Sequence, residues 1–569
     1  MVGSRVSSEI ELPGGPDLSP KTIKVVLAIL LLAGGVLRVA IAWQPLPFLI
    51  SSNMLLNDDS FYSLNIARNI ALGEGMTHDG VNRTNGFQPL FVALMVPLYA
   101  VVQGGKVLPV HLGLTLMGLI DVGTAVLLFL LVRRLGSAAG GLAAAVLWLT
   151  SAEVIGQALN GLETSIVVFL VALSTLFYVA RIRRAAECRV RDMIVMGALL
   201  GLLVLSRIDG LIYAGALGLD QLVLRLKRRD LGSWVRGLGA LAAAFVVTWS
   251  PWLLVGLVGF GELLPTSGQA TRFLSIAHDR GRMSHVPFDF DADRPSAAYL
   301  EVLTARGASQ LETLVARVVS PIAATAHALG TRSAPLTAVI LLIVAAVTWI
   351  LGRRRARNGL PGPADVAFTV PFCVLLWLAY TYYIFGQWHF PRYFMPIAFF
   401  VAGAVGLAAG AALDAVSMSA ERGGTAATLA IVVALAAPGF LGSVSLHVRA
   451  VHMRSPSFSD VNGGYIEGAR LLDQVSRPGD VCGAFQSGIL GYFSDRQIIN
   501  LGGVVNASAL QAMRSGTLME YIDSQNIRFI ADWPVNVHDD LLAPFSEPGG
   551  IARLRPVARG RWVTVYRVE

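Results

Sequence analysis

Long apolar runs recur along the chain and approach the roughly 20 residues that a helix needs to cross a lipid bilayer. In lipid the backbone must satisfy its own hydrogen bonds, so continuous runs of this kind predict helices, whereas a membrane barrel would need short alternating segments. The composition agrees, because 54% of the 569 residues are hydrophobic and only 14% are charged, against about 25% in soluble domains. The sequence therefore predicts an α-helical polytopic membrane protein.

We expect eleven membrane-spanning helices. Their ranges are 24–43, 110–132, 137–153, 161–180, 193–207, 208–224, 236–257, 335–352, 366–386, 393–415 and 425–446. Clusters of arginine and lysine lie beside these runs, and such clusters remain on the cytoplasmic side of a membrane. The clusters are Lys21 with Lys24, Arg133 with Arg134, the arginines of 181–191, the group Arg225 to Arg229, and the arginines of 353–357. Eleven spans place every cluster in the cytoplasm.

This count divides the chain into three regions. Residues 1–23 form a cytoplasmic tail, residues 24–446 a transmembrane module, and residues 447–569 a domain outside the cytoplasm. The last region is more polar and has no span, and its patterns predict a small α/β domain. They are a helix at 465–475 and strands near 480–485, 496–500, 527–532 and 561–568.

The net charge of +8 comes largely from these clusters beside apolar runs. On a soluble protein such a charge would suggest nucleic acid, but here it is typical of cytoplasmic loops. We therefore expect a lipid bilayer around the chain and no nucleic-acid partner.

The long polar connections all fall on the outer side, at 44–109 and 258–334. Within the first, residues 88–103 are apolar, but a full crossing there would place Arg133 and Arg134 outside. We interpret them as a short helix inserted from the outer side, although the sequence alone leaves a crossing open. No GxxxxGK[ST] phosphate loop is present, so nucleotide chemistry is not expected. An enzyme acting on this side would need a donor already there, such as a lipid-linked sugar.

An acidic pair, Asp58 and Asp59, opens the first outer connection. Asn57 before it can cap a helix, and Phe61 and Leu64 recur at helical spacing, so we expect an amphipathic surface helix. Two carboxylates at its start could take a proton from an acceptor hydroxyl, or hold a divalent cation such as Mg²⁺ or Mn²⁺. Helix capping and the helix dipole would by themselves account for one of the two.

Further charged residues interrupt or open the predicted spans near their outer ends. Glu163 begins one span, and Arg207 with Asp209 breaks a long apolar run. Charges at such depth need a partner or a water-filled cavity. We assign Glu163, Asp209 and the nearby Tyr62 to an acceptor-binding rim. The alternative is a structural turn whose ions pair with each other.

Basic residues at the outer ends of spans could hold a phosphate. Arg272 follows hydroxyl-bearing residues, and His389 and Arg392 lie between two spans beside aromatic residues that would anchor at an interface. An arginine at this position can bind a phosphate through two parallel N–H groups. We assign donor-phosphate binding to Arg392, His389, Arg272 and Arg207.

Two further charges, Arg38 and Asp121, lie inside predicted spans. An unpaired charge in lipid is costly, so such residues are usually paired or face a cavity. The two could pair with each other, which would be a structural role, or Arg38 could extend toward the outer site.

The order of these features resembles the GT-C superfamily, polytopic glycosyltransferases that use polyprenyl-phosphate sugars and include bacterial protein mannosyltransferases and aminoarabinose transferases. By architecture the resemblance covers residues 20–450. By residue it rests on short patches, which are Asp58 to Pro89 with Asn85-Gly86-Phe87, the turn Arg207 to Gly210, and the Arg-Tyr-x-x-Pro element from Arg392 to Pro396. The resemblance implies that Asp59 or Asp58 is the catalytic base or a metal ligand. The His-Pro-Pro-like element of protein mannosyltransferases is missing, which makes a protein acceptor less expected.

The sequence thus favours a bacterial cell-membrane enzyme that moves a hexose or pentose from a polyprenyl-phosphate donor to a cell-envelope glycan or lipid, with inversion. A transporter or flippase of lipid-linked sugars is the alternative, and it would place charges near the bilayer midplane, often in inverted repeats. A non-catalytic scaffold built on the outer domain is a second alternative, and it would not need the acidic pair. Polar motifs gathered on one side and no visible repeat favour the enzyme.

Overall fold

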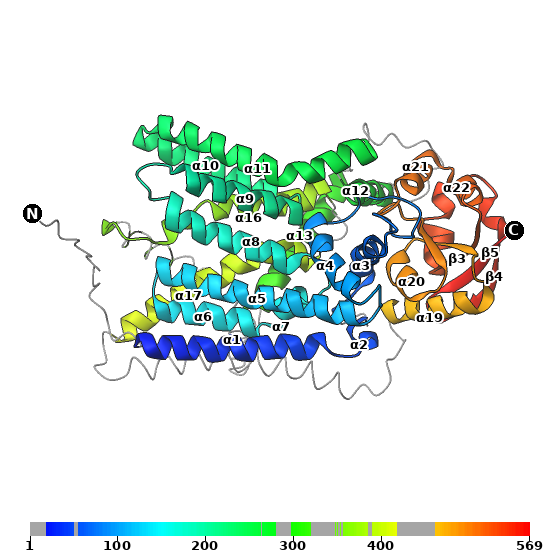
Figure 1. The fold of residues 1–569 in the computed structure, drawn as a ribbon, viewed down its shortest axis with the longest axis horizontal. Coiled ribbons are helices and arrows are strands. Elements are labelled where there is room, and N and C mark those ends of the chain that lie inside the picture. The colour runs from blue at the N-terminus through cyan, green and yellow to red at the C-terminus, as the bar shows by residue number, and fades with distance from the viewer. Residues whose placement is uncertain are drawn as a thin grey trace, which may run out of the picture.

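A bundle of long helices forms one end of the molecule and a sheet-containing domain forms the other (Figure 1). The structure is a computed structural model. It describes residues 19–50, 55–262, 265–279, 297–319, 348–384 with small gaps up to 357, 390–417 and 461–569. The predicted division into a membrane module and a C-terminal α/β domain corresponds to these two ends.

The bundle helices lie roughly along the long axis. They are α1 (Pro20–Ala42), α5 (Leu108–Leu135), α6 (Ala138–Thr150), α7 (Ala152–Ala158), α8 (Thr164–Phe177) with the π-helix η1 (Tyr178–Ile182), α9 (Val190–Ser206), α10 (Gly210–Arg228), α11 (Leu231–Phe260), the 3₁₀ turn η2 (Pro363–Val366), α16 (Thr369–Leu378) with the π-helix η3 (Ala379–Ile384), and α17 (Met395–Ser417) after the 3₁₀ turn η4 (Pro391–Phe394). Their apolar lengths are those of membrane-spanning helices.

Among the described residues, six helices are long and apolar enough to cross a membrane, or up to seven if the bent pair α6 and α7 forms one span. The predicted spans coincide with bundle helices except at 335–352 and 425–446, which lie almost wholly outside the described residues. Helix α9 has only 17 residues, and α10 ends in a basic turn. The count of eleven is therefore not confirmed.

The basic clusters of α5, η1 and α10 lie at the end of the bundle farthest from the C-terminal domain (Figure 1). Ion pairs join the segments there. Arg183 contacts Asp220 at 3.0 Å and Asp365 at 2.7 Å, and Arg184 contacts Asp365 at 2.8 Å. These ion pairs hold the segment that follows η1 against α10 and η2.

Shorter helices lie between the bundle and the C-terminal domain (Figure 1). They are α2 (Leu46–Ile50), α3 (Asp58–Ala71), α4 (Pro89–Val101), α12 (Thr266–Asp279) and α13 (Ala297–Val318). The helix predicted at the acidic pair is α3, but most of its side chains are buried, so the prediction of a surface helix was wrong. It begins with a capping box in which the side chains of Asn57 and Ser60 bond to each other's backbone N–H groups.

Helix α4 corresponds to the ambiguous segment 88–103, and its insertion from one side of the membrane stays a prediction. Its 13 residues span only about 20 Å. Before it, Gly86 packs against the Val504 carbonyl so closely that a side chain would not fit. After it, Lys106 Nζ donates to Ser494 O at 3.3 Å. Both ends of α4 thus contact the C-terminal domain and lie on the same side.

The C-terminal domain is a five-stranded sheet with helices around it. Its elements are α19 (Val461–Val475), β1 (Val481–Ala484), α20 (Ser487–Phe493), β2 (Gln497–Asn500), α21 (Ala507–Ser515), α22 (Leu518–Ser524), β3 (Ile527–Asp532), the turns η5 (Asn536–Asp540), η6 (Ala543–Phe545) and η7 (Gly550–Arg553), β4 (Leu554–Arg559) and β5 (Thr564–Val568). The strand order is β2-β1-β3-β5-β4, with β1 parallel to both neighbours and β5 antiparallel to both. Strands β1, β2, β3 and β5 lie within the predicted ranges. Strand β4 was not predicted, because this largely exposed edge strand lacks an apolar alternation.

The C-terminal domain is held to the bundle by the first turns of α3. Both carboxylate oxygens of Asp58 accept backbone N–H groups at the start of α20, from Gly488 at 3.2 Å and Ile489 at 2.7 Å. Tyr62 Oη accepts from Ser487 N at 3.3 Å. Gly488 packs so closely on the Asp58 carbonyl that an added Cβ would collide with it. Burial raises the pKa of Asp58 to about 7, and the adjacent Asp59 adds to the effect.

A buried ion pair joins α1 to α5. Arg38 Nη2 lies 2.6 Å from Asp121 Oδ2, and both side chains are almost fully buried. Trp148 Nε1 donates to the other Asp121 oxygen at 2.9 Å, and Arg38 also donates to Leu149 O at 3.1 Å. The predicted pairing of these two charges is confirmed, so they have a structural role in joining α1, α5 and α6.

Removal of one partner of this pair should destabilise the protein. We expect Asp121→Leu to lower the free energy of unfolding by about 3–5 kcal/mol, because it leaves the Arg38 charge buried and unpaired. The double variant Arg38→Met/Asp121→Leu should recover most of this loss. Thermal unfolding in detergent would measure both, and a double variant no more stable than Asp121→Leu would contradict the prediction.

Docking of the C-terminal domain should weaken as pH rises. The folded-state pKa of Asp58 lies above the usual value of 3.8, so its contribution is fully present below about pH 4 and is lost as pH rises through about 7. Hydrogen exchange of α20, corrected for the intrinsic pH dependence, should be faster at pH 8 than at pH 5. Asp58→Asn should reduce this difference, and docking that strengthens toward pH 8 would contradict it.

Candidate active site

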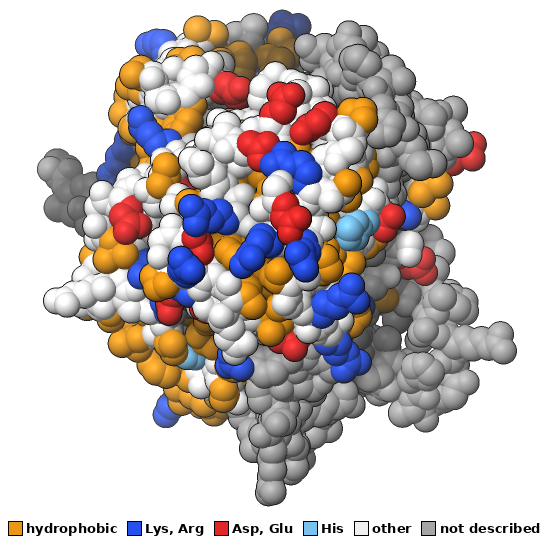
Figure 2. All heavy atoms as spheres, turned by 90° about the vertical axis from the view of Figure 1, so that its right-hand side faces the viewer, with side chains coloured by type: hydrophobic (Ala, Val, Ile, Leu, Met, Phe, Trp, Pro, Cys, Tyr) orange, Lys and Arg blue, Asp and Glu red, His pale blue; other side chains and the backbone are white. Residues whose placement is uncertain are grey.

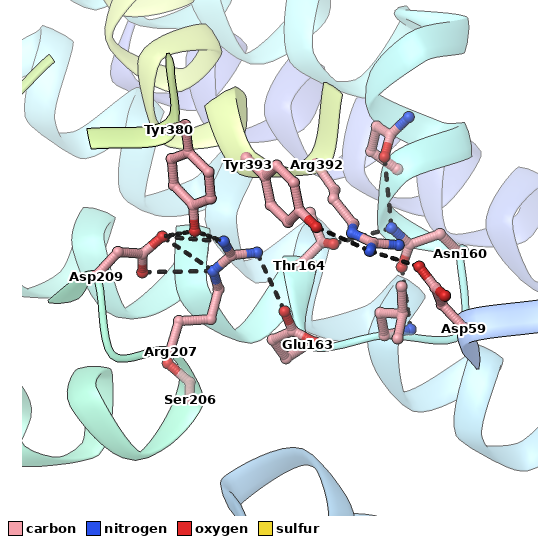
Figure 3. Close-up of polar contacts among 12 residues, drawn as sticks. Asp59, Asn160, Glu163, Thr164, Ser206, Arg207, Asp209, Tyr380, Arg392 and Tyr393 are labelled. Atoms are coloured by element: carbon pink, nitrogen blue, oxygen red, sulfur yellow. Dashed lines mark hydrogen bonds and ion pairs between the residues drawn. The ribbon is translucent and has the colours of Figure 1, made fainter. Parts of the chain in front are cut away.

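Charged and aromatic side chains from four segments meet where the bundle ends and the C-terminal domain begins. They come from the first turn of α3, the turn between α7 and α8, the turn between α9 and α10, and the segment from η3 to η4 (Figure 3). The segments are far apart in the sequence, and most of these side chains are the ones that the sequence singled out.

Asp59 and Arg392 form an ion pair. Arg392 Nη2 lies 2.7 Å from Asp59 Oδ2, and the guanidinium extends from η4 toward the start of α3 (Figure 3). The Asp59 side chain is 37% exposed, whereas Arg392 is 11% exposed. Asp59 is therefore the accessible carboxylate of the acidic pair, and Asp58 is the one used in docking.

Arg207 is held by two carboxylates. Its guanidinium contacts Glu163 at 3.1 Å and Asp209 at 3.0 Å, and all three side chains are buried. Tyr380 Oη donates to Asp209 at 2.6 Å and also contacts Arg207. The ions of this turn thus pair with each other, as the structural alternative predicted, and the acceptor-rim role of Glu163 and Asp209 stays a prediction.

Tyr393 lies between the two arginines (Figure 3). Its ring stacks on Tyr380 with centroids 4.4 Å apart and planes 10° apart. The guanidinium carbons of Arg207 and Arg392 lie 4.8 Å and 5.0 Å from the Tyr393 centroid, which is within cation–π range. Arg392 Nη2 also donates to Tyr393 Oη at 3.1 Å. The aromatic pair therefore fixes both guanidinium groups.

The turn before α8 connects the acidic pair to Glu163. Gly161 has a φ of +69°, which favours glycine, and a side chain there would collide with Leu56 and Ser60. Ser60 Oγ donates to Asn160 O at 2.7 Å, and Asn160 Nδ2 donates to Thr164 at 2.9 Å. These bonds fix the start of α3 relative to the rim.

Three further residues were predicted to belong to the site. Tyr62, assigned to the acceptor rim, is 6% exposed, and its hydroxyl donates to Phe485 O at 3.2 Å. Arg272 lies on α12, and its role stays a prediction. His389 lies outside the described residues.

Tyr380 was not predicted as a site residue, and Tyr393 was predicted only as an interface anchor and as part of the Arg-Tyr-x-x-Pro element. Tyrosines are common at membrane interfaces, so neither carried a distinct signal. The only local clue was that Tyr393 directly follows Arg392.

The residues of this site do not fit a divalent cation. Within the part of the chain that the structure describes, no group of three or more His, Cys, Asp or Glu is placed to hold a metal. Both Asp58 oxygens accept N–H groups, and Asp59 contacts a cation already.

The sequence comparisons identify only the last part of the chain. A family model described as a domain of unknown function (DUF8728) matches residues 459–566. The chain matches no curated protein by sequence.

Solved structures resemble nearly the whole chain. ArnT from Cupriavidus metallidurans bound to undecaprenyl phosphate is 14% identical with a TM-score of 0.57, covering 97% of this chain and 98% of that one. Its apo state has the same TM-score and identity, covering 96% and 98%. AglB from Archaeoglobus fulgidus, in complex with an inhibitory peptide and a dolichol-phosphate, is 11% identical with a TM-score of 0.50, covering 92% and 71%. Such likeness shows the fold alone, and the chain shares the fold of ArnT and AglB over nearly its whole length.

Proposed function

We propose that this protein is a membrane glycosyltransferase that transfers a sugar from a polyprenyl-phosphate donor to a hydroxyl of a cell-envelope glycan or lipid. The observation that carries the proposal is the Asp59–Arg392 ion pair, a half-exposed carboxylate 2.7 Å from an arginine at the bundle's outer end. A base and a phosphate-binding cation side by side are what such a transfer needs. The fold shared with ArnT, whose structure holds undecaprenyl phosphate, supports the choice of donor.

The orientation that we propose places the site on the outer face of the cytoplasmic membrane. The basic clusters lie at the opposite end of the bundle (Figure 1), and such clusters stay in the cytoplasm. The N-terminus is then cytoplasmic and the C-terminal domain lies outside. On that face, a lipid-linked sugar is a donor that needs no nucleotide.

In the proposed reaction Arg392 binds the donor phosphate and stabilises the charge that grows on it as the sugar leaves. His389 and Arg272 are proposed to assist. Asp59 takes the proton of the acceptor hydroxyl, whose oxygen attacks the anomeric carbon. A single displacement of this kind inverts the anomeric centre.

Arg207, Glu163 and Asp209 fit supporting roles better than donor binding. Arg207 already contacts two buried carboxylates, so a phosphate there would have to displace one of them. We propose that Arg207 orients Tyr393 and thereby Arg392. Glu163 and Asp209 hold Arg207 in place and form the wall on which an acceptor would lie.

A flippase of lipid-linked sugars is the main competing function. The Arg38–Asp121 pair inside the predicted spans is buried and so offers no exposed charge to a polar cargo. Ion pairs of Arg183 and Arg184 join the segments at the far end of the bundle. Neither feature is what a route between the two leaflets requires.

Transfer should depend strongly on Asp59. In proteoliposomes with radiolabelled polyprenyl-phosphate sugars and glycan or glycolipid acceptors, Asp59→Asn should lower kcat by about 100-fold or more, since general-base catalysis contributes about 10²–10⁴. Asp523→Asn is the matched control, because it also removes a carboxylate from an arginine pair, at 2.7 Å from Arg553 on the C-terminal domain. It should retain full activity.

Two outcomes would overturn the proposal. Full activity of a combined Asp58→Asn/Asp59→Asn variant would exclude the carboxylates from catalysis. Movement of donors between leaflets without any transfer would establish the flippase instead.

A further inference from the structure

The two arginines of the site differ in how their charge is balanced. Arg207 has two buried carboxylate partners and two tyrosine rings around it. Among the described residues, Arg392 has one carboxylate in ion-pair contact, Asp59, and the Phe390 and Tyr393 rings lie against its guanidinium. The group of Arg207, Glu163 and Asp209 is therefore anionic as a whole, whereas Arg392 and Asp59 together are neutral. An incoming anion would therefore bind Arg392 more readily than Arg207, because fewer carboxylates compensate the charge of Arg392.

The contact between Asp59 and Arg392 is also of a kind that an anion can replace. Among the contacts of the described residues, Asp59 and Tyr393 both bond to the same nitrogen, Nη2 of Arg392. A phosphate can bind a guanidinium through two parallel N–H groups, which is stronger than a single charged hydrogen bond. The carboxylate is 37% exposed, so water can solvate it once it leaves.

We propose that the phosphate of the lipid-linked donor displaces Asp59 from Arg392, so that the catalytic base becomes free only when the donor is bound. This inference rests on the proposed function of the site. Without donor, a carboxylate oxygen of Asp59 is bonded to Arg392. With donor, the same carboxylate is free beside the anomeric carbon, and donor binding must precede acceptor activation.

The subsequent transfer balances in charge and atoms. The acceptor O–H bond breaks and its proton goes to Asp59, while the acceptor oxygen forms a bond to the anomeric carbon. The bond between that carbon and the phosphate oxygen breaks, and the electron pair stays on the polyprenyl phosphate. The product phosphate carries one more negative charge and stays on Arg392, while the protonated Asp59 no longer competes for it.

The test measures binding separately from catalysis. Full-length protein in nanodiscs would be titrated with a polyprenyl monophosphate that carries no sugar. We expect Asp59→Asn to bind this lipid about fivefold more tightly than the native protein, because a competing ion pair of about 1 kcal/mol is removed. Asp59→Glu keeps a carboxylate and should show a smaller gain, and Asp523→Asn should show none.

A second variant tests whether the gain arises at Arg392. Arg392→Gln should weaken binding, and Asp59→Asn should give no further gain in the Arg392→Gln background. Unchanged or weaker binding by Asp59→Asn, alongside normal binding and transfer by the native protein, would overturn this inference alone. Failure of the native protein to bind the lipid phosphate would overturn the proposed function as well.

Discussion

The first turn of α3 holds the two ends of the molecule together, and the site depends on it. Successive residues of an α-helix point about 100° apart, so two adjacent carboxylates cannot face the same partner. Asp58 accepts the N–H groups that begin α20, whereas Asp59 faces Arg392. The capping box at Asn57 fixes where this turn begins. The C-terminal domain and the candidate base are therefore positioned by one structural element.

Charge balance explains how charged residues can be buried in the bundle. A charge taken out of water is costly unless it is paired and hydrogen-bonded. Arg38 with Asp121 and Arg207 with its two carboxylates meet this requirement through contacts that also join separate helices. The Asp59–Arg392 pair differs because one partner remains exposed to water.

The same fold occurs in ArnT at 14% identity over nearly the whole chain. Such divergence is compatible with a common fold because lipid constrains the spans mainly to be apolar helices, which many sequences satisfy. Chemistry resides in particular sites, so the fold alone does not define the sugar or the acceptor. At this outer end the chain uses a carboxylate, two arginines and a stacked tyrosine pair.

The length of the apolar runs determined the bundle helices. Charges near the ends of the predicted spans, together with the family resemblance, indicated the acidic pair, Glu163, Arg207 and Arg392, because a charge in lipid is costly. The sequence could not distinguish Asp58 from Asp59, since adjacent carboxylates are alike until each meets a partner. It also did not indicate that Tyr62 packs against the C-terminal domain or that Tyr380 stacks on Tyr393. Those contacts join residues far apart in the chain, and only the packing of α3, α20, η3 and η4 in three dimensions decides them.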